Sequence, residues 1–197
     1  MTQNYRLSSV DLDYIRTNFV RFEDACVAAA VTVSTARALR DREVLPHPTY
    51  VLDDGTEYVP ADFFTLLKSV SEPDRVRPLL IVRLTARAQS HHELLPDEAA
   101  EGEWRSYLSG DYGVCLREVT PENMYDKERL VRRLSLQLAT PLPAESLWCH
   151  QLRSEVDALD ALLRPFALSD RARFGGFVSR DRLVTLPRLV YSHAFNG

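Results

Sequence analysis

The sequence has few cysteines and no long apolar run. Its three cysteines, Cys26, Cys115 and Cys149, are far apart and odd in number, which argues against a disulfide framework and fits a reducing compartment. The longest apolar run, residues 79–82, is interrupted by Arg83, and the N-terminus lacks the basic and apolar segments of a secretion signal. We therefore expect a cytoplasmic protein that does not associate with a membrane.

The motifs of many well-known enzyme classes are also missing. The sequence contains no phosphate-binding loop, no dinucleotide fingerprint and no G-x-S-x-G nucleophile motif, so kinase, dehydrogenase and hydrolase functions lose their usual support. The five histidines form no H-x-x-x-H pair, and no two cysteines have zinc-binding spacing. We expect neither a metal nor an organic cofactor.

Apolar residues recur with helical spacing along most of the chain, which predicts a mainly α fold. The expected helices begin at Ser9 and at Pro60, and also cover residues 22–30, 34–43, 76–88, a stretch ending near 108, 121–138, 144–163 and 180–191. The apolar residues of the 144–163 helix are expected to be buried: Leu147, Leu152, Val156, Leu159 and Leu163. A short extended piece is expected at residues 114–117.

One β-hairpin is expected, with strands at residues 49–52 and 56–59. The Asp-Gly pair between them is typical of tight hairpin turns, because glycine readily adopts the positive φ that such turns need. We expect residues 1–68 to form a helix-turn-helix-like segment with this hairpin and residues 69–197 to form a helical body, the two making one compact unit.

The element order in residues 22–52 resembles the winged helix-turn-helix of MerR-type regulators, in which the second helix enters the major groove of DNA. Arg37, Arg40 and Arg42 can then contact phosphates. Residues 1–60, however, hold six arginines and nine acidic residues, and non-specific DNA affinity comes mainly from neutralising phosphates. A MerR-like DNA-binding regulator is therefore the alternative function, and nucleic acid is not the favoured partner.

Arginines gather near the C-terminus. Only two of the 24 basic residues are lysines, and residues 164–188 contain six arginines against two aspartates, in a chain of net charge -4. Gly175 and Gly176 permit positive φ angles, and Ser179 is placed to cap the final helix. Guanidinium groups beside a helix N-terminus favour anions. The predicted anion-binding residues are Arg171, Arg173, Arg180 and Arg182. The alternative is that these arginines lie on a solvated face or pair with carboxylates.

Two polar clusters on irregular backbone are candidates for a catalytic base. Asp54 lies in the hairpin, and Asp111 lies in a turn with glycines on both sides; either carboxylate can act as a general base. Further candidates from the same two clusters are Tyr50, Glu57, Tyr112 and Arg117. The alternative is that these side chains close turns and cap helices.

Three motifs carry a resemblance to a known family. They are Y-V-L-x-D-G-T-E-x-V-P at residues 50–60, Y-L-S-G-D-Y-G-V-C-L-R at 107–117, and R-P-F followed by D-R and F-G-G-x-V-S-R-D-R within 164–182. The chain resembles an actinobacterial family of unknown function whose members are often described as natural-product biosynthesis proteins. It departs from the family pattern at Phe177, where proline is expected, and at residues 168–169, where an aromatic residue often precedes Asp170.

Within that family the chain resembles a subunit of the two-component aziridine-forming enzyme of azinomycin-type pathways. The resemblance implies that an amine attacks a carbon bearing sulfate in the same molecule and expels sulfate. It also implies a heteromeric complex with a dissimilar subunit, and a small-molecule substrate carried on an acidic amino-group carrier protein. In such a reaction the arginines would bind the anion, and Asp54 or Asp111 would accept the proton.

Overall fold

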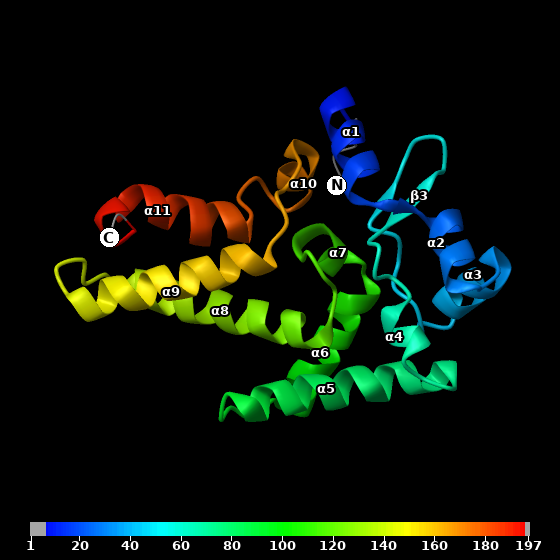
Figure 1. The fold of residues 1–197 in the computed structure, drawn as a ribbon, viewed down its shortest axis with the longest axis horizontal. Coiled ribbons are helices and arrows are strands. Elements are labelled where there is room, and N and C mark those ends of the chain that lie inside the picture. The colour runs from blue at the N-terminus through cyan, green and yellow to red at the C-terminus, as the bar shows by residue number, and fades with distance from the viewer. Residues whose placement is uncertain (1–6, 196–197) are drawn as a thin grey trace. The chain divides into compact units, whose positions relative to one another are not determined.

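Helices dominate the structure, as the periodicity predicts, and the mainly α fold class is confirmed (Figure 1). The structure is a computed structural model that describes residues 7–195. The chain divides into two compact units: one holds residues 9–125, and the other holds residues 126–195 together with residues 7 and 8. Every helix within 7–195 is too short or too polar to cross a lipid bilayer.

The unit of residues 9–125 combines helices with a small sheet. Its elements are α1 (Ser9–Asn18), β1 (Val20–Arg21), α2 (Phe22–Ala29), α3 (Val33–Asp41), β2 (Tyr50–Val51), β3 (Glu57–Val59), α4 (Thr65–Lys68), η1 (Pro73–Arg75), α5 (Val76–Ser90), α6 (Asp97–Leu108), α7 (Asp111–Cys115) and the first turn of α8 (Pro121–Ala139). The other unit holds the rest of α8, followed by α9 (Ser146–Leu162), α10 (Leu168–Arg173), η2 (Asp181–Thr185), α11 (Leu186–Val190) and η3 (Ser192–Ala194).

The sheet has three antiparallel strands in the order β1-β3-β2. The expected hairpin supplies β2 and β3, with Tyr50 opposite Tyr58, and its turn contains Gly55 at φ +81°. The third strand, β1, pairs Val20 with Val59 and was not predicted. A two-residue strand between helices is too short to show alternation, so only its tertiary pairing identifies it.

Helices α2 and α3, joined by a short turn, lie where the helix-turn-helix-like segment was predicted, and the hairpin follows them in the chain. Ala30 ends α2 in the left-handed conformation (φ 56°), and Thr32 caps α3 by accepting a hydrogen bond from the Thr35 amide at 3.1 Å. The apolar face of α3, with Ala36 and Leu39, is buried. This local chemistry explains why two short helices with an abrupt turn form here.

The segment 114–117 is not the extended piece that the sequence suggested. Val114 and Cys115 lie in α7, and extended backbone begins only at Leu116. Gly110, at φ +80°, reverses the chain so that a new helical turn starts at Asp111. A Cβ at Gly110 would lie 2.5 Å from the carbonyl oxygen of His47, so backbone packing fixes this turn. The helix expected from Pro60 likewise begins only at Thr65, after a series of turns.

The unit of residues 126–195 has a core of aliphatic side chains. Leu152 and Leu159 of α9 are fully buried, as their spacing predicts, together with Leu134 of α8. Leu147 was also expected to be buried but is 78% exposed. At about 100° per residue it lies about 140° around the helix from Leu152, whereas Trp148 in the same turn lies close to the buried side. The expected 180–191 helix is present, but its first part, η2, is a π-helical turn.

Candidate functional site

The predicted anion-binding arginines lie in the unit of residues 126–195, where three arginines near the C-terminus pair with carboxylates. Arg171 of α10 binds both carboxylate oxygens of Asp181, at 2.7 and 2.9 Å, and donates a third hydrogen bond to the Phe166 carbonyl at 3.1 Å. The hydrogen bond from Arg171 lowers the pKa of Asp181 below its usual value. This bidentate pair joins α10 to the start of η2, so it fixes the loop with the two glycines between them.

A second set of ion pairs joins the C-terminal segment to α9. Arg180 forms an ion pair with Asp160 and donates a hydrogen bond to the Leu163 carbonyl at 3.3 Å. Arg188 donates to Asp160 at 2.6 Å and to Asp157 at 2.7 Å. Burial raises the pKa of Asp160, but the hydrogen bond from Arg188 and the charges of both arginines outweigh it and lower the pKa. These aspartates lie one helical turn apart, so α9 presents them on one face.

The remaining two predicted arginines are exposed. Arg173 lies over the ring of Phe174, 5.4 Å from its centroid. The guanidinium of Arg182 has no ion pair or hydrogen bond with any of residues 7–195, and Arg182 lines a pocket of about 420 Å³. Gly175 and Gly176 have φ angles of +81° and +91° with open space around each, so these positive φ angles, not close packing, favour glycine there.

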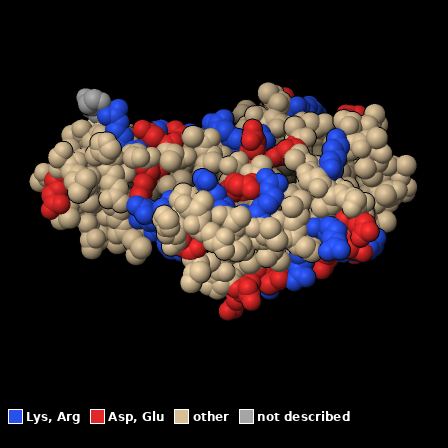
Figure 2. Space-filling view, turned by 60° about the horizontal axis from the view of Figure 1, so that its bottom comes forward, with Lys and Arg blue, Asp and Glu red and all other residues tan. Residues whose placement is uncertain are grey.

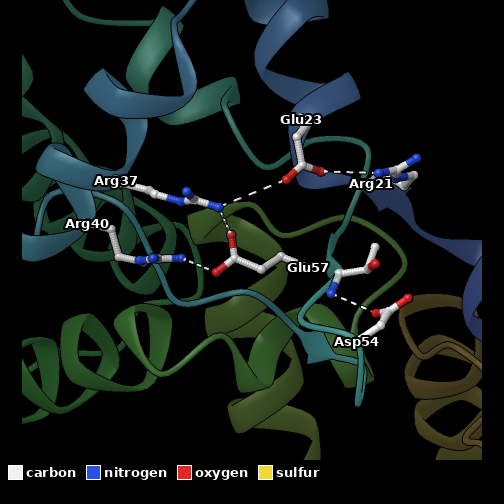
Figure 3. A network of polar contacts seen from close by, with 7 residues as sticks. Arg21, Glu23, Arg37, Arg40, Asp54 and Glu57 are labelled. Carbon is white, nitrogen blue, oxygen red and sulfur yellow. Dashed lines mark hydrogen bonds and ion pairs between the residues drawn. The ribbon is translucent and has the colours of Figure 1, made fainter.

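The hairpin candidates lie in the other unit, and most of them have a structural contact. Asp54 is exposed and accepts a hydrogen bond from the Thr56 amide at 2.9 Å, which closes the turn and lowers the pKa of Asp54 (Figure 3). Tyr50 is buried, with its ring 4.9 Å from that of Phe19. A base with a lowered pKa accepts a proton less readily at neutral pH.

Glu57 connects the hairpin to the second helix of the helix-turn-helix (Figure 3). Its carboxylate lies 2.7 Å from Arg40 and 3.5 Å from Arg37, and Arg37 also lies 4.0 Å from Glu23. The side chain of Arg40 is 17% exposed, whereas that of Arg37 is 50% exposed. Ion pairs therefore join β3 to α3. The Glu57 carboxylate pairs with two of the arginines that were expected to contact phosphates.

The second polar cluster surrounds α7. Asp111 is half-buried at the start of this helix, and Arg117 is exposed after it. Tyr112 is buried and donates its hydroxyl hydrogen to Glu103 of α6. Burial, followed by the charge of Asp62, raises the pKa of the nearby Tyr107. The roles of Asp111 and Arg117 in catalysis stay predictions.

The hairpin segment and the α7 turn enclose a cavity of about 20 Å³. Asp62, Tyr107 and Tyr112 are among the residues that line it, and Asp62 also accepts a hydrogen bond from the Val119 amide at 2.5 Å. This volume is sufficient for about one water molecule and too small for a substrate. Among the described residues, there is no cluster of three or more His, Cys, Asp or Glu side chains that could hold a metal ion.

Sequence reasoning missed two features of the unit of residues 126–195. The 420 Å³ pocket is formed by α8 residues and by η2 and α11 residues that are far apart in the chain. The carboxylate partners of the arginines also lie on other elements. Basic and acidic side chains are interspersed on the face shown in Figure 2, which fits a surface on which most charges are paired.

The sequence model of a family of unknown function (DUF6058) matches residues 82–192. The match spans more than half of the chain, so the protein belongs to this family. It begins within α5 and ends at the first residue of η3, and it leaves α2, α3 and the hairpin outside. Neither a curated protein nor a solved structure matches the chain.

Proposed function

We propose that this member of the DUF6058 family is one subunit of a heteromeric natural-product biosynthetic enzyme, and that the assembled enzyme closes an aziridine ring with loss of sulfate. The three motifs at residues 50–60, 107–117 and 164–182 support the proposal through their resemblance to such proteins. The second and third motifs lie inside the matched family region.

The observation that carries the subunit role is a set of exposed leucines on segments that meet at one end of the unit of residues 126–195. Contacts define this end: Gln137 donates to the Trp148 carbonyl at 3.1 Å, and His193 lies 3.0 Å from the Pro143 carbonyl oxygen. The end of α8, the start of α9 and the C-terminal turn therefore meet there. The exposed leucines are Leu136 (68%), Leu142 (49%), Leu147 (78%) and Leu189 (72%). We call these four residues the leucine end.

Several exposed leucines on segments that meet at one end of this unit favour a partner surface. Single exposed apolar residues are common, but clustered ones on a folded protein mark interaction sites. When a second subunit covers exposed apolar side chains, these are removed from water. The hydrophobic contribution to binding is about 25 cal/mol per Å² of apolar surface buried. The leucine end thus supports a dissimilar subunit as the partner.

The proposed reaction needs positioning and charge stabilisation. The amine nitrogen attacks the carbon that bears sulfate, the new C–N bond forms as the C–O bond breaks, and sulfate leaves with the bonding electrons. A general base accepts the proton of the resulting ammonium, and Asp54 and Asp111 remain the candidates on this chain. A guanidinium beside the departing sulfate would stabilise the charge that develops on it. Arg182 is suited to this role because its guanidinium has no carboxylate partner among residues 7–195.

The experiment combines the purified chain with a candidate dissimilar subunit and a sulfated amine substrate, and measures free sulfate. We expect sulfate release from the mixture and not from either protein alone. Leu147→Asp should abolish co-elution on size exclusion and lower sulfate release at least tenfold, because a charge at an apolar interface is costly. Leu94→Asp is the matched control, since Leu94 is 93% exposed and lies in the other unit. Equal release by the chain alone would contradict the proposal.

A second candidate function, DNA binding, is favoured by the helix-turn-helix geometry of α2 and α3. The N-terminal turn of α3 exposes Ser34 and Thr35, where such helices contact bases. The acidic hairpin tip and the pairing of Arg37 with Glu57 weigh against it. A gel-shift titration with promoter DNA near the gene, at two salt concentrations, tests this function. Tight and sequence-specific binding would favour a regulator over the enzyme subunit.

A further inference from the structure

The 420 Å³ pocket in the unit of residues 126–195 has apolar walls. Leu138 of α8 forms one side, and Leu183, Leu186 and Val190 of η2 and α11 form the other. Leu186 is 44% exposed and Val190 is 57% exposed, so these walls are not covered by the rest of the chain. The volume falls within the range of about 300–1,000 Å³ that is typical of small-molecule sites.

Two hydrogen-bond donors line this pocket without a partner among residues 7–195. One is the guanidinium of Arg182, and the other is the hydroxyl of Tyr191, whose ring packs on Trp148 with the centroids 5.1 Å apart. The hydroxyl of Ser135, also in the lining, donates to the Val131 carbonyl at 2.7 Å and has its lone pairs left to accept. Arg182 and Tyr191 lie at opposite ends of the η2–α11 helix, on the order of 10 Å apart along its axis.

The charge of Arg182 distinguishes it from its neighbours in the chain. Arg171, Arg180 and Arg188 each bind an aspartate, which neutralises them. Arg182 lacks such a partner within 7–195, and no acidic residue lines the pocket. An apolar cavity with one unneutralised guanidinium is complementary to a ligand that has an apolar body and a single anionic group.

We propose that this pocket binds an amphipathic small molecule whose carboxylate, sulfate or phosphate pairs with Arg182 and whose apolar body lies against Leu138, Leu186 and Val190. A hydrogen-bond acceptor at the far end of the ligand is received by the Tyr191 hydroxyl. The described lining residues all belong to this chain, so ligand binding can be measured without the partner subunit and separately from sulfate release.

The test uses calorimetric titration of the purified full chain with octyl sulfate below its micelle concentration. Octanol and sodium sulfate are titrated in parallel, because they carry only the apolar body or only the anion. We expect octyl sulfate to bind at least tenfold more tightly than either. Octanol binding as tight as that of octyl sulfate would show apolar adsorption only, and sodium sulfate binding as tight would show an ion site without the pocket. If octyl sulfate did not bind at all, there would be no such site. Each of these results overturns the proposal.

Two substitutions locate the site. Arg182→Gln should weaken octyl sulfate binding by roughly 10- to 100-fold and leave octanol binding unchanged, because it removes a hydrogen bond to a charged group. Arg153→Gln is the matched control: Arg153 is a partly exposed arginine of α9 outside the pocket lining, 4.0 Å from Asp157. Thermal unfolding confirms that both variants fold. Equal losses of affinity in the two arginine variants, or unchanged binding by the Arg182 variant, would overturn the assignment. The second locating substitution is Leu186→Trp, whose larger side chain fills the pocket. It should abolish the binding of octyl sulfate and octanol alike.

Discussion

The two units of the chain use their arginines differently. In the unit of residues 9–125, Arg37 and Arg40 of α3 share the carboxylate of Glu57, and Arg37 also lies 4.0 Å from Glu23. In the unit of residues 126–195, Arg171 binds both carboxylate oxygens of Asp181, while Arg182 has no carboxylate partner among the described residues. The net charge of a segment therefore does not tell which arginine is available to a ligand. That depends on which acidic side chain the fold brings within reach.

The largest effect that we expect comes from a residue that carries no charge. Gly110→Ala should lower the free energy of unfolding by about 2–5 kcal/mol, because the new Cβ would need positive φ and would displace a neighbouring backbone. The Cβ would lie 2.5 Å from the His47 carbonyl oxygen. Gly102→Ala, at an open position within α6, should instead stabilise by about 0.5–1 kcal/mol. Chemical denaturation measures both, and equal effects would show that close approach does not hold this unit together.

In the other unit, the pairing of arginines should matter more than their number. Arg171→Ala should cost about 1.5–3 kcal/mol, because it leaves Asp181 without its bidentate donor. Arg173→Ala should change stability by less than about 0.5 kcal/mol, since Arg173 is exposed over Phe174. Thermal unfolding of both variants measures this contrast. Similar values would mean that the Arg171–Asp181 pair does not fix the loop.

The pH dependence of stability also tests the ion pairs of Asp181 and Asp160. The pKa values of Asp181 and Asp160 are lowered in the folded state, so their pairs contribute stability above the unfolded pKa of about 3.9. That contribution should be lost as the pH falls below about 4 towards the folded values. Melting curves between pH 7 and pH 3 should therefore show a steeper loss for the wild type than for Asp181→Asn. Parallel curves would contradict the assignment.

The smallest effect is expected at α3. Glu57→Gln would remove the carboxylate that Arg37 and Arg40 share, while Arg37 keeps its contact with Glu23. Up to two further phosphate contacts would raise non-specific DNA affinity at low salt by about tenfold or less. The salt dependence of binding should steepen, with a slope change of up to about -1.8 for two contacts. Asp41→Asn, on the exposed face of the same helix, is the control for a change in net charge alone. Equal gains in both variants would mean that Glu57 does not restrain the arginines.

The candidate site was only partly accessible from the sequence. Arginine enrichment directed attention to the C-terminal segment, but composition gives the same weight to Arg171, Arg180 and Arg182. Only the positions of Asp160 and Asp181 distinguish them. Asp54 is a general-base candidate by residue type, yet its hydrogen bond to the Thr56 amide is also what a hairpin turn requires. Its catalytic role stays a prediction.

The sequence by itself determined the local features of this protein. Helical spacing, the Thr32 cap and Gly55 in the hairpin turn act over a few residues, so they can be read directly from neighbouring positions. Tertiary structure alone decided the pairing of β1 with β3, the close approach at Gly110 and the pocket beside Arg182. Each depends on contacts between segments far apart in the chain, and local periodicity does not specify which distant groups meet.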